Sequence, residues 1–273
     1  MSQLISPRRS PFATVRLAGA TLLMAAAAAL SACNLDISNQ SEGRSEWKKD
    51  YTLTVGGSLE IKNTNGLIEI DPSSDDTHVT IIAERIAKAG TDDEAKKAAE
   101  GIEIKETVSG SSIVIDARVT SSGINIGGSR QVKFHIRAPK GTVLTLSNTN
   151  GNIDVRDMTG ELRLDTTNGR IVGKNLEGTT KAETTNGIVD LDFAAIGTGG
   201  ISADTTNGKV DITLAKNIKA RINARVTNGA ISTDNLSLET SESSRKRLTA
   251  TINGGGPEIR VETTNGAVMV RGR

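Results

Sequence analysis

The sequence predicts an all-β fold: a parallel β-helix-like β-solenoid with coils of about 18–21 residues and one short helix in its N-terminal section. Two observations predict it. An Asn-Gly pair recurs in a shared frame along the chain, and apolar residues alternate with polar ones on both sides of it. An antiparallel meander is the alternative fold, because Asn-Gly between alternating runs is also the strongest short signal for a hairpin.

Seven copies carry the frame, in which Thr or Asn precedes Thr-Asn-Gly, with Val226 as the exception. A hairpin requires the Asn-Gly but does not explain the Thr that precedes it in every copy. Stacked coils do, since identical Thr and Asn side chains on successive rungs can form hydrogen-bonded ladders. The solenoid is therefore the preferred interpretation. The copies read LEIKNTNGLIEI, LTLSNTNGNIDV, LRLDTTNGRIVG, TKAETTNGIVDL, ISADTTNGKVDI, INARVTNGAIST and IRVETTNGAVMV.

The first 32 residues read as a lipoprotein signal peptide. A basic segment without acidic residues precedes an apolar run, Leu17 to Ala29, which is shorter than the roughly 20 residues of a membrane span. Leu30-Ser31-Ala32-Cys33 resembles the lipobox of bacterial lipoproteins, and this resemblance implies cleavage before Cys33 and attachment of lipid to its sulfur. Cys33 is the single cysteine, so a disulfide within the chain is excluded.

Residues 33–46 are expected to form the lipidated cysteine and a polar tether, because the segment lacks periodicity. Removal of the signal leaves 30 basic against 32 acidic residues, which argues against nucleic acid as a partner and against a polybasic membrane patch. The membrane contact is therefore expected through the lipid. Asn34 follows the cysteine where Asp would suggest retention at the inner membrane, so the outer membrane is expected in a Gram-negative cell.

Residues 47–142 are expected to form a β-rich N-terminal section, and residues 143–273 the TTNG-repeat solenoid. In the N-terminal section, HVTIIAERI, SSIVIDARV and QVKFHIRAP read as strands. TDDEAKKAAEG, from Thr91, reads as a helix with a capping box formed by Thr91 and Glu94.

The framed copies resemble the bacterial putative-adhesin family of β-strand-repeat lipoproteins, whose function is unknown. The resemblance covers roughly residues 50–273 and implies a β-solenoid-like fold at the cell envelope. The long insert Ser237–Arg247 departs from the pattern and puts regular stacking there in doubt.

Candidate chemistry is sparse. His78 and His135 lie far apart and without metal-ligand spacing, and no nucleophile elbow occurs, so no enzyme activity, catalytic residue or cofactor is predicted. The glycine-rich GINIGGSR, from Gly123, and Gly254-Gly255-Gly256-Pro257 both read as turns.

Stacking would align outward carboxylates in two columns. One holds Asp165, Glu183 and Asp204, with Arg163 and Lys181 nearby to neutralise it. The other holds Asp154, Asp190 and Asp211, of which Asp190 and Asp211 would lie about 5 Å apart and could ligate a divalent cation. A solvated, charge-compensated face is the preferred interpretation, and no metal is predicted.

The sequence favours a non-enzymatic interaction module of the cell envelope, which presents a polar face to an unknown envelope protein or polymer. Two alternatives stay open: a structural or stress-associated envelope scaffold, and a polysaccharide-active enzyme on a β-helix. Sugar sites commonly use exposed aromatic rings, and the repeat array has almost none.

Overall fold

The computed structural model describes residues 40–118 and 129–273. The signal segment, Cys33 and most of GINIGGSR lie outside these residues. Gln40–Arg273 forms one compact unit. No helix in the described ranges is long and apolar enough to span a bilayer.

Each coil of the array consists of a strand that ends at the Asn of the repeat and a second strand that follows the Gly. We call these the first leg and the second leg. First legs pair in parallel with first legs of neighbouring coils, and second legs with second legs. This parallel pairing confirms the β-solenoid over the meander. The first five coils are β2/β3 (Ser58–Asn65, Ile68–Pro72), β8/β9 (Val143–Asn150, Ile153–Arg156), β10/β11 (Leu162–Asn168, Ile171–Leu176), β12/β13 (Thr180–Asn186, Val189–Phe193) and β14/β15 (Ile201–Asn207, Val210–Leu214).

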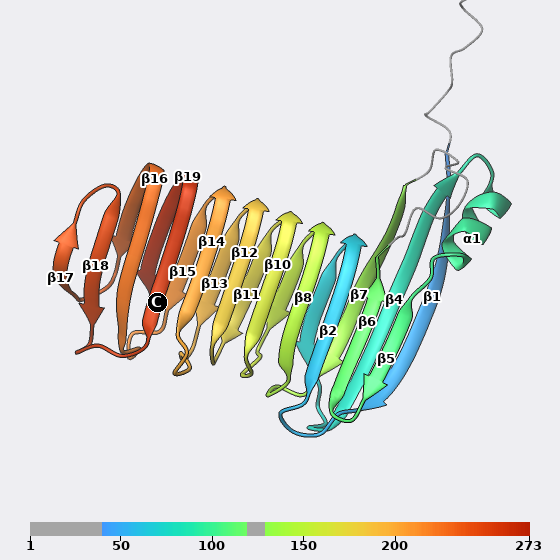
Figure 1. The fold of residues 1–273 in the computed structure, drawn as a ribbon, viewed down its shortest axis with the longest axis horizontal. Helices are drawn as coiled ribbons and strands as arrows, with labels where there is room; N and C mark the ends of the chain where they lie inside the picture. The colour runs from blue at the N-terminus through green and yellow to red at the C-terminus, as the bar shows by residue number, and fades with distance from the viewer. Residues whose placement is uncertain (1–39, 119–128) are drawn as a thin grey trace, which may run out of the picture. The chain divides into compact units, whose positions relative to one another are not determined.

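The last two coils are not stacked in chain order. β16 (Ala220–Asp234) and β19 (Glu258–Gly272) each run through both legs as one long strand. β19 pairs with β14 and β15 on one side and with β16 on the other, so the C-terminal strand lies between two coils that are consecutive in the sequence (Figure 1).

The insert after β16 explains this order. Ser237–Arg247 contributes to a hairpin of β17 (Leu238–Ser243) and β18 (Arg247–Ile252), and β18 pairs antiparallel with the outer edge of the β16 first leg. With that edge occupied, the next repeat stacks on the inner side of β16. The doubt about regular stacking at the insert is thus confirmed.

A continuous ladder of asparagines runs along the corner between the two legs. From the second member onward, each Nδ2 donates to the Oδ1 of the preceding Asn over 2.8–2.9 Å. This ladder confirms the predicted stacking of Asn side chains. Its members, in spatial order, are Asn65, Asn150, Asn168, Asn186, Asn207, Asn265 and Asn228.

The threonines behave differently from the predicted ladder. The first Thr of the repeat is buried and donates to the Gly carbonyl of the adjacent coil, as Thr184 does to Gly169 at 3.2 Å. The second Thr, which immediately precedes Asn, points outward, as Thr185 does. The repeat therefore holds one structural Thr and one that is free to form a surface.

The interior is filled by the predicted alternating aliphatic columns. Leu162, Leu164 and Ile171 are at most 1% exposed, and the corresponding side chains of the other coils are also buried. Full burial of such a side chain contributes about 1.5–3 kcal/mol. Because the chain has no disulfide to form, this core and the backbone ladders stabilise the fold.

The N-terminal section extends both rows of legs. β6 (Ser112–Ala117) pairs with β2, and β7 (Arg130–Ala138) pairs with β3. β5 (Lys105–Ser109) pairs with β6, and β4 (His78–Ala89) pairs with β7. Helix α1 (Asp92–Glu100) is capped by Thr91, whose Oγ1 accepts a bond from the Glu94 amide at 3.3 Å. The predicted helix and its N-cap are confirmed.

The prediction of a polar tether over residues 33–46 is wrong for its last six residues. β1 (Ser41–Thr52) already begins at Ser41 and pairs with β4 along its whole length. Gly43 lies so close to α1 that a Cβ there would be 2.1 Å from the Ala95 carbonyl carbon. The segment shows little apolar alternation because glycine and ion pairs of Arg44 with Glu42 and Glu84 replace large side chains.

Candidate binding groove

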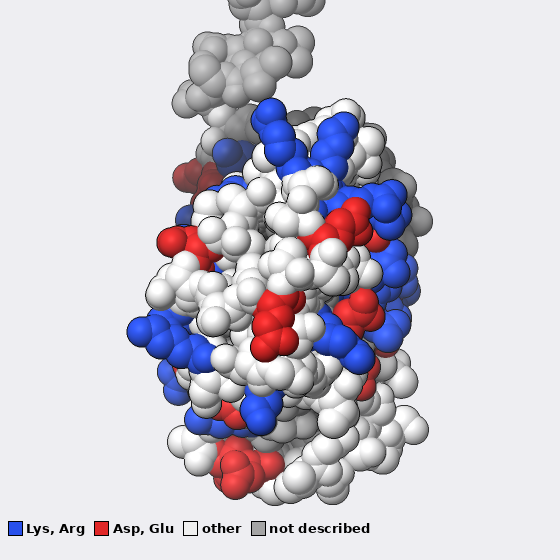
Figure 2. Space-filling view, turned by 90° about the vertical axis from the view of Figure 1, so that its left-hand side faces the viewer, with Lys and Arg blue, Asp and Glu red and all other residues white. Residues whose placement is uncertain are grey.

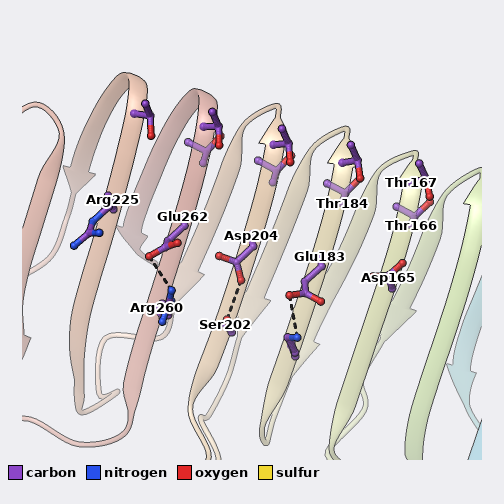
Figure 3. A pocket seen from close by; sticks show the side chains of 17 residues that line it. Asp165, Thr166, Thr167, Glu183, Thr184, Ser202, Asp204, Arg225, Arg260 and Glu262 are labelled. Atoms are coloured by element: carbon purple, nitrogen blue, oxygen red, sulfur yellow. Dashed lines mark hydrogen bonds and ion pairs between the residues drawn. The ribbon is translucent and has the colours of Figure 1, made fainter.

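A groove of about 670 Å³ lies on the outer face of the first legs and crosses β10, β12, β14, β19 and β16 (Figure 3). One row of its lining consists of the outward threonines, one per coil, and all five are exposed. They are Thr167, Thr185, Thr206, Thr264 and Thr227. Below this row runs a row of charged side chains, which are Asp165, Glu183, Asp204, Glu262 and Arg225.

The carboxylate column predicted from the repeat is present. Asp165 is in register with Glu183, and Glu183 with Asp204. The intercalation of β19 adds Glu262 beside Asp204, which the sequence frame did not reveal. Neighbouring strands lie about 4.8 Å apart, so Glu183 and Asp204 each face a like charge on both sides.

The negative charge of this carboxylate column is only partly neutralised by cationic side chains. Lys181 Nζ lies 2.9 Å from Glu183 Oε1, and Arg260 forms a 3.0 Å ion pair with Glu262. Asp165 and Asp204 form no ion pair among the described residues, although Ser202 donates to Asp204 at 3.0 Å. Of the two cations predicted to neutralise the column, Lys181 does so and Arg163 makes no ion pair in the part of the chain described.

The two uncompensated carboxyls have altered pKa values. Partial burial raises the pKa of Asp165, and the charge of Glu183 raises it further. Partial burial also raises the pKa of Asp204, with additional contributions from Glu262 and Glu183 that the Ser202 hydrogen bond partly offsets. For both carboxyls the native state therefore disfavours the ionised form.

This preference gives a testable effect of pH. A raised pKa means that the native state prefers the protonated carboxyl. Ionisation of the carboxyl above that pKa therefore destabilises the native state. This destabilisation disappears below the pKa of the unfolded chain, about 3.9. We expect Asp204→Asn to raise the free energy of unfolding by about 0.5 kcal/mol at pH 7. The gain should shrink as pH falls and vanish near pH 3.

Urea unfolding followed by circular dichroism at several pH values measures this effect. Asp76→Asn, an exposed turn residue, is the control and should change stability little at any pH. A gain at Asp204 that persists unchanged at pH 3 would show that its charge is not the cause.

The second predicted column lies on the outer face of the second legs. Asp190 and Asp211 are register partners, whereas Val172 separates Asp190 from Asp154. Asp190 pairs with Arg170 at 2.7 Å, and Asp211 pairs with Lys209 at 2.7 Å. These cations occupy the positions around the two carboxylates, in keeping with a charge-compensated face. Among the described residues no group of three or more His, Cys, Asp or Glu is arranged to hold a metal ion.

The histidines stay apart in the fold. His78 Nε2 lies 3.3 Å from Asp50, and His135 Nδ1 lies 2.8 Å from Glu69. Gly254 and Gly255 have φ values of 81° and 86° in the turn between β18 and β19, as the glycine-rich sequence predicts.

Sequence reasoning missed the basic end of the groove. Stacking in chain order would place Arg225 between Asp204 and Glu262. The intercalation of β19 instead places Arg225 beyond Glu262, at the end of the carboxylate column. The available signals were the insert itself and Val226 in place of the structural Thr.

Residues 157–271 match the family model described as Toastrack DUF4097. The match covers less than half of the chain and marks a similarity of this segment to the Toastrack family. The match confirms the resemblance to a β-strand-repeat family of unknown function, and the matched segment contains every residue that lines the groove. No curated protein matches the chain.

Two solved structures are similar to the chain. One is described as "a putative cell adhesion protein from Clostridium sporogenes ATCC 15579"; it is 12% identical, with a TM-score of 0.41 and coverage of 84% of this chain and 100% of that one. The other is described as "a putative adhesin" from Bacteroides fragilis NCTC 9343; it is 11% identical, with a TM-score of 0.39 and coverage of 84% and 97%.

Proposed function

We propose that the protein is a non-enzymatic binding module of the cell envelope, anchored by lipid on Cys33, whose Toastrack domain holds an extended hydroxyl-bearing polymer in the groove. The observation that carries the proposal is the lining of the groove. On each of five successive coils it offers one outward Thr and one charged side chain.

The regular spacing favours an elongated ligand over a compact one. Equivalent side chains repeat about every 4.8 Å along the solenoid axis. That spacing is close to the length of one sugar residue in an extended chain, so successive coils can contact successive residues of a glycan. An extended peptide advances only about 3.4 Å per residue and would lose register within a few coils.

The chemistry of the lining suits hydroxyl groups. Asp165 and Asp204, which lack a cationic partner among the described residues, can accept hydrogen bonds from sugar hydroxyls, and the Thr hydroxyls can both donate and accept. Because no aromatic side chain lines the groove, recognition rests on hydrogen bonds of about 0.5–1.5 kcal/mol each. Many weak contacts along a polymer then supply the affinity.

The placement at the envelope rests on the sequence. The lipobox at Cys33 provides the anchor, and the nearly balanced charge of the mature chain offers no second attachment to a bilayer. With Asn34 after the cysteine, we place the protein at the outer membrane if the source is Gram-negative.

Retention of the purified protein on insoluble envelope polysaccharide tests the proposal. Thr167→Val/Thr185→Val/Thr206→Val removes three hydroxyls at nearly constant shape and should weaken retention at least tenfold. The control, Thr80→Val/Thr213→Val/Ser232→Ala, removes three hydroxyls on β4, β15 and β16 outside the groove and should bind as the wild type does. No retention of the wild type, or equal loss in both variants, would contradict the proposal.

A further inference from the structure

The charge of the groove reverses at its C-terminal end. The carboxylate column ends at Glu262, and the next first-leg position along the axis is Arg225. On the far side of Arg225 the register partner is Arg247 of β18. The sequence of charges along the axis is therefore a run of carboxylates followed by two guanidinium groups.

Arg225 and Arg247 are directly opposite in an antiparallel pair, so their side chains share one face. Both residues are exposed, and neither side chain forms an ion pair or hydrogen bond within the described ranges. Glu262, the carboxylate beside Arg225, is already paired with Arg260. Like charges opposite each other destabilise a sheet, so these two arginines lower the stability of the domain without a compensating contact.

The loop that carries Arg247 is held firmly against the solenoid. Ser244 Oγ accepts bonds from the amides of Lys246 at 3.3 Å and Arg247 at 3.0 Å. The Lys246 carbonyl accepts the Val226 amide at 2.9 Å, and the Arg245 carbonyl accepts the Ile231 amide at 2.9 Å. The basic segment 245–247 is thus fixed beside β16, next to the groove. Figure 2 shows this end of the molecule, where Lys and Arg side chains are interspersed with Asp and Glu.

We propose that Arg225 and Arg247 form an anion anchor at the C-terminal end of the groove, which binds a carboxylate or phosphate carried by the polymer. The inference rests on the proposed function and specifies its ligand as an acidic glycan or related polyhydroxylated polymer. Guanidinium groups suit this task because they bind planar oxyanions through paired N–H donors. The hydroxyls of the same polymer would lie against the threonines and carboxylates of the preceding coils.

The test uses three polymers: polygalacturonate as the carboxylate source, a poly(glycerol phosphate) as the phosphate source, and a neutral glucan. Binding of the full chain to each is measured by calorimetry. Arg225→Gln/Arg247→Gln should weaken binding of at least one acidic polymer tenfold or more and leave the neutral one within twofold. The acidic polymer that responds identifies the anion.

Lys96→Gln/Lys97→Gln, on the exposed side of α1, removes the same charge far from the groove in sequence and should change binding less than twofold. Thermal unfolding checks that both variants are folded, and loss of the Arg225–Arg247 repulsion should not lower the unfolding temperature. The inference fails if the wild type binds neither acidic polymer, or if the arginine and lysine variants lose affinity equally. If the Thr→Val variant alone loses binding, the groove stands and the anchor is refuted.

Discussion

Removal of residues 258–273 is expected to abolish cooperative folding of the repeat array. In a solenoid stacked in chain order, loss of the last repeat would trim one end. Here β19 is an interior coil with a partner on each side. The deletion removes four fully buried side chains, Ile259, Val261, Val268 and Val270, which together contribute about 6–12 kcal/mol. That loss is comparable with the whole stability of a typical domain, about 5–15 kcal/mol.

Urea unfolding followed by circular dichroism compares the truncated and full chains. Val108→Ala serves as a control, because Val108 is 53% exposed on β5 and should cost less than about 1 kcal/mol. An unchanged unfolding midpoint in the truncated chain would mean that β16 can stack directly on β14 and β15. Because β16 and β19 carry the same repeat frame, β16 could take the place of β19 in this way.

Gly208→Ala is expected to destabilise the domain by about 3 kcal/mol. A Cβ at this position would lie 1.6 Å from the Gly187 carbonyl oxygen of the adjacent coil. Both backbones are held by the asparagine ladder and by parallel strand pairing, so neither can retreat without breaking hydrogen bonds. The glycine of the repeat is required chiefly by this close approach.

Gly141→Ala is the matched control for Gly208. No heavy atom lies within 4 Å of a Cβ at Gly141, and its stability should stay within about 0.5 kcal/mol of the wild type. Equal midpoints for the two variants in urea would show that the coils can separate locally, against the packing described above.

The repeat made the coil predictable from the sequence. Because the side-chain period of a strand is two, the alternation around Asn168-Gly169 identified both the buried column and the outward carboxylates. The asparagine ladder followed from the same register. The two threonines were harder to separate, since only three-dimensional stacking shows that Thr184 reaches a carbonyl while Thr185 faces solvent.

Two features lay beyond a linear repeat. The position of β19 depends on competition between β18 and β19 for the two edges of β16, which is a tertiary choice that no local pattern encodes. The early start of β1 was hidden because Gly43 meets a helix from a later part of the chain. The same choice shapes the groove, since Arg225 lies at the end of the charged row only because β19 is inserted between β14 and β16.

Threonine-methyl NMR of the protein, titrated with solubilised envelope polysaccharide, tests the binding groove most directly. Shifts are expected at Thr167, Thr185 and Thr206, which line the groove, and none at Thr80 or Thr213, which lie outside it. Shifts confined to Thr80 and Thr213, or no shift at any of the five, would contradict it.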